Sequence, residues 1–358
     1  MSLTPMSATD VITRLADFDS IIDARSEAEF DEDHLPQAIN WPTLNNAERI
    51  DIGTLYKLVN PFEARKRGAA IAARNIAAHI DREVIDKPKD WKPLAYCWRG
   101  GQRSGSLSLI LSQIGFRVTL VEGGYKAFRA AVVQDIARLT QGLRFRVICG
   151  PTGSGKTRLL QALAAQGAQV IDLEALANHR SSVLGAMPGL AQPTQKRFDT
   201  LIWNQLRSFD ASRPVFVESE SKKVGNLAVP VALMDAMRGS PCLNLQLSDN
   251  ERVALLMEDY VYLMQDVDYF CDRLSVLIPL KGRAVVTSWQ TQARGGQFAP
   301  VVLDLLNNHY DPAYLQSMQR NFLQFGEVQH IAATDRSTAA MAQLAGQIMS
   351  LPGSSGEA

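Results

Sequence analysis

Short apolar runs alternate with helical repeats along most of the chain, and each run ends at a polar or glycine-rich loop. The runs predict strands at 20–25, 94–96, 117–121, 145–148, 169–174, 214–221 and 241–247. Between them, apolar side chains recur at spacings of three and four, the period of an α-helix, as at Leu107, Ile110, Leu111 and Ile114. Residues 30–42 contain two prolines and are expected to form a loop. The alternation of strands and helices predicts an α/β protein.

Two of the helical stretches have more than one interpretation. The stretch 45–79 carries a cluster of basic residues, namely Lys57, Arg65, Lys66, Arg67 and Arg74. A solvated helix face is the simpler interpretation, and contact with a nucleic-acid backbone is the alternative. Another stretch carries an apolar stripe, which consists of Val253, Leu256, Met257, Tyr260, Val261 and Met264. We expect this stripe to pack in a core, and a lipid pocket is the alternative.

Length and composition limit the class of protein. A chain of 358 residues is long for one domain, so two are expected. The formal net charge is +0, so binding of nucleic acid has to depend on local patches. The four cysteines are far apart, which indicates neither a zinc site nor a disulfide framework. No apolar run approaches about 18 residues and the N-terminus shows no leader pattern, so we expect a cytoplasmic protein without a membrane partner.

Residues 149–157, Cys-Gly-Pro-Thr-Gly-Ser-Gly-Lys-Thr, lie between a predicted strand and a predicted helix. Their G-x-x-x-x-G-K-[ST] spacing in this context is typical of a phosphate-binding loop. Backbone N–H groups and a helix N-terminus converge there, and Lys156 adds a mobile positive charge, so the expected ligand carries a diphosphate or triphosphate. The predicted phosphate-binding residues are Gly150, Thr152, Gly153, Ser154, Gly155, Lys156 and Thr157.

Three residues are candidate ligands of a magnesium ion at this loop. Thr157 would present its hydroxyl. Acidic residues at the carboxyl ends of strands help to hold the ion in nucleotide-binding sheets, which makes Glu218 the next candidate and Asp172 the third. For both acids the alternative is a carboxylate that merely ends a strand.

Cys97 begins the loop Cys97-Trp98-Arg99-Gly100-Gly101-Gln102-Arg103-Ser104, between another strand and helix. A helix N-terminus, free amides and two arginines all favour the thiolate form of a cysteine. The loop therefore predicts a nucleophilic Cys97 with Arg99 and Arg103 as its catalytic partners. A small buried hydrophobe is the alternative.

The N-terminal part of the chain resembles the rhodanese family. The resemblance rests on Asp23-Ala24-Arg25, His34–Asn40, the Cys97–Arg103 loop and Glu122-Gly123-Gly124. It implies an α/β domain in which the loop cysteine, here Cys97, carries sulfur as a persulfide or selenium as the corresponding selenosulfide.

Residues 21–330, which cover most of both predicted domains, resemble the tRNA 2-selenouridine synthase family. Besides the two loops, the similarity rests on Val170–Arg180 and Phe216–Ser221, and it departs from the family at Ser181–Gly185, where a glycine-rich stretch is expected. The resemblance implies that the sulfur of wobble 2-thiouridine in tRNA is replaced by selenium from selenophosphate. It also implies prior S-geranylation with geranyl diphosphate, whose diphosphate would bind the loop at Gly150–Thr157. A nucleotide such as ATP is also compatible with that loop.

The expected architecture is an N-terminal rhodanese-like domain followed by a P-loop NTPase- or kinase-like parallel-sheet domain. The expected boundaries are 8–130 for the first domain, 131–143 for a helical connector, 144–350 for the P-loop domain and 351–358 for a disordered tail. The main alternative function is an ATP-dependent kinase fused to a sulfurtransferase domain. Another is a nucleotide-gated tRNA-binding module with degenerate catalysis, against which the intact Cys97 and Lys156 argue. The sequence leaves the oligomeric state open.

Overall fold

The structure is a computed structural model that describes residues 2–180 and 189–351. Contacts divide the chain into two compact units, residues 1–137 with 193–204, and residues 138–192 with 205–358. The departure at Ser181–Gly185 and the tail from 352, which was expected to be disordered, lie outside the described residues. No helix of the described part combines the length and the apolar character that crossing a membrane requires.

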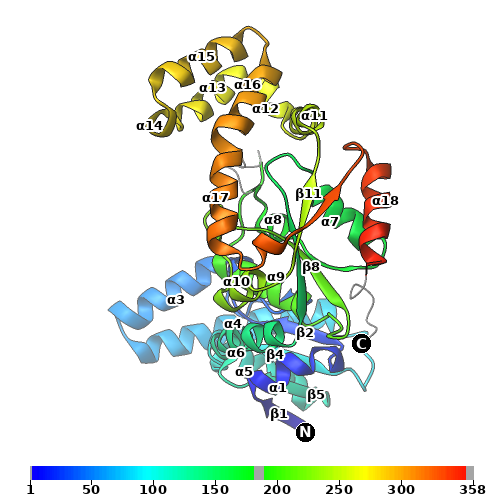
Figure 1. The fold of residues 1–358 in the computed structure, drawn as a ribbon. Coiled ribbons are helices and arrows are strands. Elements are labelled where there is room, and N and C mark those ends of the chain that lie inside the picture. The colour runs from blue at the N-terminus through cyan, green and yellow to red at the C-terminus, as the bar shows by residue number, and fades with distance from the viewer. Residues whose placement is uncertain (1, 181–188, 352–358) are drawn as a thin grey trace. The chain divides into compact units, whose positions relative to one another are not determined.

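Five parallel strands form the sheet of the first unit, in the order β1-β5-β4-β2-β3 (Figure 1). Their bounds are β1 Ser2–Met6, β2 Ser20–Asp23, β3 Ala38–Asn40, β4 Pro93–Tyr96 and β5 Arg117–Val121. The three predicted strands of this region are confirmed. The prediction of a loop at 30–42 is wrong in part. This stretch contains the end of helix α2 (Glu27–Glu32) and strand β3, which pairs with β2. Helix α2 starts at Glu27 because Ser26 and Glu29 form a capping box.

The first unit contains further helices, of which the one at 46–58 packs on the one at 61–83 and buries none of its own residues. They are α1 Ala8–Thr13, the 3₁₀ turn η1 Leu15–Asp17, α3 Asn46–Leu58, α4 Pro61–Glu83, α5 Gln102–Ile114 and α6 Gly124–Gln141. The predicted helical stretch 45–79 is confirmed as α3 and α4, each of which starts at an asparagine cap. The predicted helix after the cysteine loop is α5, which ends at Gly115 in a left-handed conformation. Apolar side chains of α5, including Leu107 and Leu111, pack on Ala95 of the sheet.

Most of helix α9 (Gln195–Leu206) also belongs to the first unit, through residues 193–204. The expected boundaries placed these residues in the second domain. Trp203 of α9 is fully buried, and its Nε1 donates a hydrogen bond of 2.9 Å to the Asp135 carboxylate of α6. The Thr200 hydroxyl donates to the Asp33 carboxylate at 2.9 Å. These contacts explain why α9 packs with the first unit.

The second unit has a five-stranded parallel sheet in the order β12-β11-β6-β8-β7. The bounds are β6 Arg144–Cys149, β7 Gln169–Ile171, β8 Pro214–Glu218, β11 Cys242–Gln246 and β12 Gln329–Ala332, and β9 Lys223–Val224 pairs with β10 Leu227–Ala228. The four predicted strands are present, and Cys242 at the start of β11 is buried. The strand expected at 169–174 ends at Ile171, because the Asp172 side chain caps helix α8 (Leu173–Ala177).

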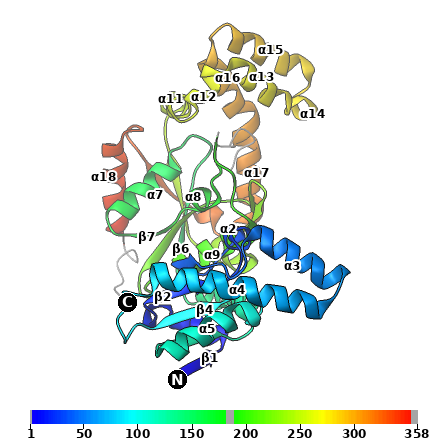
Figure 2. The same ribbon diagram turned by 180° about the vertical axis from the view of Figure 1, so that it is seen from behind.

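Helices pack against this sheet, and a helical group is inserted between β11 and β12. α7 (Lys156–Ala165) and α18 (Thr338–Met349) share one apolar cluster and lie side by side in both views (Figures 1 and 2); α10 spans Val231–Arg238. The inserted elements are α11 Asp249–Asp259, α12 Val261–Gln265, α13 Val267–Ser275, α14 Ile278–Lys281, α15 Arg283–Arg294, α16 Phe298–Leu305, the π-helical turn η2 Leu306–Tyr310, α17 Asp311–Asn321 and the 3₁₀ turn η3 Phe325–Glu327. This group has its own core, which includes Leu274 and Trp289.

Candidate functional site

The predicted phosphate loop connects β6 to α7, as expected for this motif. Gly150 and Gly153 have φ values of 151° and 77°. A Cβ atom would lie 2.5 Å from Ser154 Oγ at Gly150 and 3.0 Å from Leu256 Cδ1 at Gly153, so both positions require glycine. Helix α7 has Gly155 as its N-cap without a side-chain hydrogen bond. Its first amides therefore remain available to an anion.

Lys156 and Tyr314 hold the start of the loop. Lys156 Nζ donates to the Gly150 carbonyl at 2.8 Å, and the Gly150 amide donates to the Tyr314 hydroxyl of α17 at 2.7 Å. The Tyr314 hydroxyl also lies 3.2 Å from Ser219 Oγ, and burial raises its pKa, so it remains a neutral hydroxyl. A bound phosphate would compete with the Gly150 carbonyl for Lys156.

Arg252 of α11 is a positioning residue that the sequence analysis missed. Its side chain is buried, and Nε and Nη2 donate to the Thr152 carbonyl of the phosphate loop at 3.0 and 2.8 Å. The same guanidinium makes a two-bond contact with Asp311 at the start of α17, at 2.6 and 2.9 Å. Arg252 therefore links the loop to the helix that carries Tyr314.

Three carboxylates gather beside the phosphate loop, from Glu174 of α8, Glu218 at the end of β8 and Glu220 just after it. One oxygen from each lies within 4.8 Å of the others. Glu218 is 1% exposed, and its Oε1 has no hydrogen-bond partner among the described residues. Burial, followed by the charges of Glu174 and Glu220, raises the pKa of Glu218 well above its ordinary value. An unpartnered buried carboxylate oxygen beside two more carboxylates fits a hard divalent cation such as Mg²⁺.

The predicted metal candidates therefore have different positions. Glu218 lies in the carboxylate group, and Thr157 lines the same cleft. Asp172 lines the cleft too, but its Oδ1 accepts a hydrogen bond of 2.8 Å from the Ala175 amide as the cap of α8. Glu174 and Glu220 were not predicted as ligands, although both lie within two residues of a predicted one.

The cleft at this site has a volume of about 530 Å³, within the usual range of ligand pockets. Most of the predicted phosphate-binding residues line it, namely Thr152, Gly153, Gly155, Lys156 and Thr157. Ser154 is buried, and its Oγ has no partner among the described residues. Arg158, His179 and Arg180 add further polar side chains to the walls. The cleft thus combines a phosphate cradle with a carboxylate group.

Part of the apolar stripe that was expected to pack in a core instead lines a cavity next to this cleft. That expectation is wrong for Leu256, Met257 and Met264, whereas Tyr260 lines the cavity and also packs against the core of the inserted helices. Leu256, Met257, Tyr260 and Met264 face the cavity. The helix predicted across them breaks at Tyr260, which separates α11 from α12. The break turns the two parts of the stripe toward a common space instead of along one core face.

In the first unit, Cys97 lies at the end of β4, where the loop leads into α5. The residue is 3% exposed and contacts an apolar cluster, and its Sγ accepts a hydrogen bond of 3.1 Å from the Ser104 hydroxyl. Gly124 packs against the loop so closely that a Cβ there would lie 2.2 Å from the Cys97 carbonyl oxygen. The Glu122-Gly123-Gly124 segment therefore supports the shape of the loop. A chalcogen carried on Sγ would extend about 2 Å beyond it.

The two predicted arginine partners of Cys97 differ in their contacts. Arg99 is exposed. Arg103 makes a two-bond ion pair with Glu29, with Nη1 at 2.5 Å from Oε2 and Nη2 at 3.2 Å from Oε1. Although burial alone would raise the pKa of Glu29, the hydrogen bond and charge of Arg103 lower it to about 2. Arg103 is thus held in place beside the loop.

Two family profiles match the chain. The one described as "tRNA 2-selenouridine synthase AAA domain" covers residues 143–275, and the one described as "Rhodanese-like domain" covers residues 7–131. The tRNA 2-selenouridine synthase of Sulfurovum sp. (strain NBC37-1) is 30% identical over 347 residues, which is 87% of this chain and 93% of that protein. The chain belongs to the tRNA 2-selenouridine synthase family. The predicted fold class, a rhodanese-like domain followed by a P-loop domain, is confirmed.

Other members of the synthase family align over a shorter part. The relative from Nitrosomonas europaea is 35% identical over 245 residues, 67% of this chain and 63% of that protein, so the alignment spans less than two thirds of the relative. Among solved structures, the chain titled "N-terminal domain of putative ATP/GTP binding protein from Clostridium difficile 630" is 34% identical, with a TM-score of 0.31 and coverage of 37% of this chain and 98% of that one. A rhodanese-related protein from Thermoplasma volcanium is 18% identical, with a TM-score of 0.23 and coverage of 35% and 89%.

Proposed function

We propose that this protein replaces the sulfur of wobble 2-thiouridine in tRNA by selenium, with selenophosphate as the selenium donor and geranyl diphosphate as a co-substrate. One observation carries the proposal: a chain of the tRNA 2-selenouridine synthase family holds both an intact Cys97 loop and an intact phosphate loop beside a carboxylate group. The protein is therefore expected to act in the cytoplasm, where its tRNA substrate is found.

In the first step, the sulfur of 2-thiouridine attacks C1 of geranyl diphosphate. The C–S bond forms, the C1–O bond breaks, its electron pair leaves with the diphosphate, and the uracil N3 loses its proton. Lys156 and the open amides of α7 stabilise the negative charge on the departing diphosphate. Bound Mg²⁺, held by Glu218 with Glu174, Glu220 and Thr157, would neutralise part of the same charge.

Before the second step, the Cys97 thiolate attacks the selenium of selenophosphate: the S–Se bond forms, the P–Se bond breaks, and its electron pair leaves with phosphorus as phosphite. In the second step, the selenium held on Cys97 attacks C2 of the geranylated base. The C2–Se bond forms, the C2–S bond breaks, and the sulfur leaves as geranyl thiol, a better leaving group than the sulfur of the unmodified base. A free thiol then attacks the Cys97 sulfur, the sulfur–selenium bond breaks, and selenouridine is released with a mixed disulfide left on Cys97. A second thiol attacks this mixed disulfide, leaves as the disulfide of the two thiols and regenerates Cys97. The arginines Arg99 and Arg103 lie in the loop that starts at Cys97 and are the proposed contacts for selenophosphate.

The test separates the two steps by two substitutions in the full chain. Lys156→Ala should lower geranyl transfer to 2-thiouridine tRNA by about 100-fold or more, because it removes charge from the leaving diphosphate. Lys223→Ala, at an exposed lysine, is the matched control. Unimpaired transfer by Lys156→Ala would remove the phosphate loop from the first step.

Cys97→Ser should leave geranylation intact and stop selenium incorporation, measured by mass analysis of the tRNA nucleosides. Cys271→Ser is the control, because the Cys271 thiol already donates to the Gln290 carbonyl and a hydroxyl can do the same. Normal selenation by Cys97→Ser would contradict the role of Cys97. Steady ATP consumption with a phosphorylated product, independent of selenophosphate, would instead favour the kinase alternative.

A further inference from the structure

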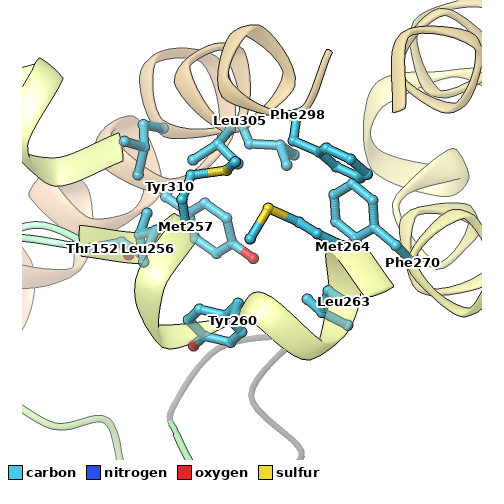
Figure 3. A pocket seen from close by; sticks show the side chains of 12 residues that line it. Thr152, Leu256, Met257, Tyr260, Leu263, Met264, Phe270, Phe298, Leu305 and Tyr310 are labelled. Carbon is cyan, nitrogen blue, oxygen red and sulfur yellow. The ribbon is translucent and has the colours of Figure 1, made fainter. Parts of the chain in front are cut away.

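The cavity beside the phosphate cleft is lined by apolar side chains, which the binding of a diphosphate does not require. Its walls come from α11, α12, α13, α16 and the π-helical turn η2. Nearly all of the side chains that line it are aliphatic, aromatic or methionine, and none is charged (Figure 3). A space lined in this way favours an apolar ligand over a well-hydrated one.

The cavity shares part of its wall with the phosphate cleft. Thr152, Leu256, Tyr260 and Tyr310 line both spaces, and Thr152 belongs to the phosphate loop itself. In Figure 3, Thr152 and Leu256 lie on one side of the cavity, and Phe270 and Phe298 lie on the other. The rings of Phe270 and Phe298 have centroids 6.0 Å apart, so they contact each other and form a wall opposite the phosphate loop.

We propose that this cavity binds the hydrocarbon tail of the allylic diphosphate and that Phe270 and Phe298 limit the length of that tail. The assignment rests on the proposed function and adds to it the residues that select the substrate. A single ligand with a diphosphate on Lys156 and an isoprenoid chain next to Leu256 would occupy both spaces. A nucleotide would leave the cavity without an occupant, because its base and ribose need polar partners.

Size favours a short chain. The cavity volume of about 60 Å³ corresponds to roughly four to six water-sized volumes. Met257 and Met264 are unbranched side chains that adjust to a ligand more easily than the two phenylalanines do. A geranyl chain is therefore expected to fit after small side-chain movements, whereas a farnesyl chain, one isoprenoid unit longer, meets the phenylalanine wall.

The experiment measures transfer from dimethylallyl, geranyl and farnesyl diphosphate to 2-thiouridine tRNA by the full chain. Phe298→Ala removes part of the wall and should raise the farnesyl-to-geranyl ratio by about tenfold or more, a typical effect of chain length in an apolar pocket. Val302→Phe narrows the cavity and should lower geranyl transfer relative to dimethylallyl transfer. Val285→Phe makes the same change at an exposed position of α15 and should leave the ratios unchanged.

A second measurement needs no tRNA. Wild-type protein should bind geranyl diphosphate more tightly than inorganic diphosphate, and Val302→Phe should remove most of that difference while retaining the Kd for inorganic diphosphate. Geranyl transfer by the wild type with unchanged chain-length ratios in both variants would overturn the cavity assignment and leave the proposed function standing. No geranyl transfer by the wild type would overturn both.

Discussion

At the scale of single residues, the ion pair between Glu29 and Arg103 couples the cysteine loop to the stability of the first unit. Arg103 lowers the pKa of Glu29 from 4.5 to about 2, and the Glu29 side chain is 18% exposed. Folding therefore favours the ionised carboxylate. The resulting stability is fully present above the unfolded pKa and is lost as the pH falls from about 5 toward 2.

Glu29→Gln should remove this pH dependence. The shift corresponds to a contribution on the order of 3 kcal/mol to the free energy of unfolding at neutral pH. Urea unfolding at pH 3 to 7 measures it, and tryptophan fluorescence mainly reports the first unit, which contains Trp41, Trp91, Trp98 and Trp203. Asp31→Asn, an exposed carboxylate of the same helix, is the control. Equal loss of stability at low pH in wild type and Glu29→Gln would contradict the prediction.

The sequence predicted residues whose chemistry is local and missed residues whose role depends on the fold. Lys156 and Thr157 follow from the spacing of one loop, and the structure places both at the phosphate cleft. Glu174 was assigned to the end of a strand, but an Asp172 cap turns the chain there and brings Glu174 to Glu218. Arg252 contacts Thr152, 100 positions away in the chain, and an arginine on a helix gives no sign of such a partner in the sequence.

At the scale of elements, α9 is the part of the chain that completes the first unit. Trp203 is fully buried and contacts the ring of Phe128 edge-on, with centroids 5.7 Å apart. Trp203→Ala should lower the free energy of unfolding of the first unit by about 3–5 kcal/mol, because it leaves a large cavity. Urea unfolding followed by near-UV circular dichroism tests this, with the exposed Asn204→Ala as the control on the same helix. A loss of less than 1 kcal/mol, as expected for a surface position, would contradict the packing of α9 described above.

The sequence predicted most strands but not which unit α9 completes. Strand and helix patterns report that a face is buried, and they do not report the partner that buries it. The contacts that assign α9 to the first unit, among them those of Thr200, Trp203 and Asp199, are visible in the fold alone. The prediction that the stripe around Tyr260 packs in a core was wrong in part for a similar reason. The spacing of apolar residues is the same in a filled core and in the wall of a cavity.

At the scale of the whole molecule, the two proposed half-reactions depend on different units. Lys156 belongs to the second unit and Cys97 to the first. A protein blocked in one step should therefore retain the other, provided that it receives the right tRNA. This division predicts that Lys156→Ala and Cys97→Ser differ in their activity on the geranylated tRNA that links the two steps.

When tRNA that already carries S-geranyl-2-thiouridine is supplied, Lys156→Ala should form selenouridine at a rate close to wild type, since no diphosphate has to leave. Cys97→Ser should form no selenouridine from this geranylated tRNA, although it can itself geranylate 2-thiouridine tRNA. Mass analysis of nucleosides measures both outcomes, and selenophosphate and a free thiol are the other reagents added. A Lys156→Ala protein that is equally inactive on geranylated and unmodified tRNA would show that the phosphate loop also serves the selenium step, and the two-site division would be wrong.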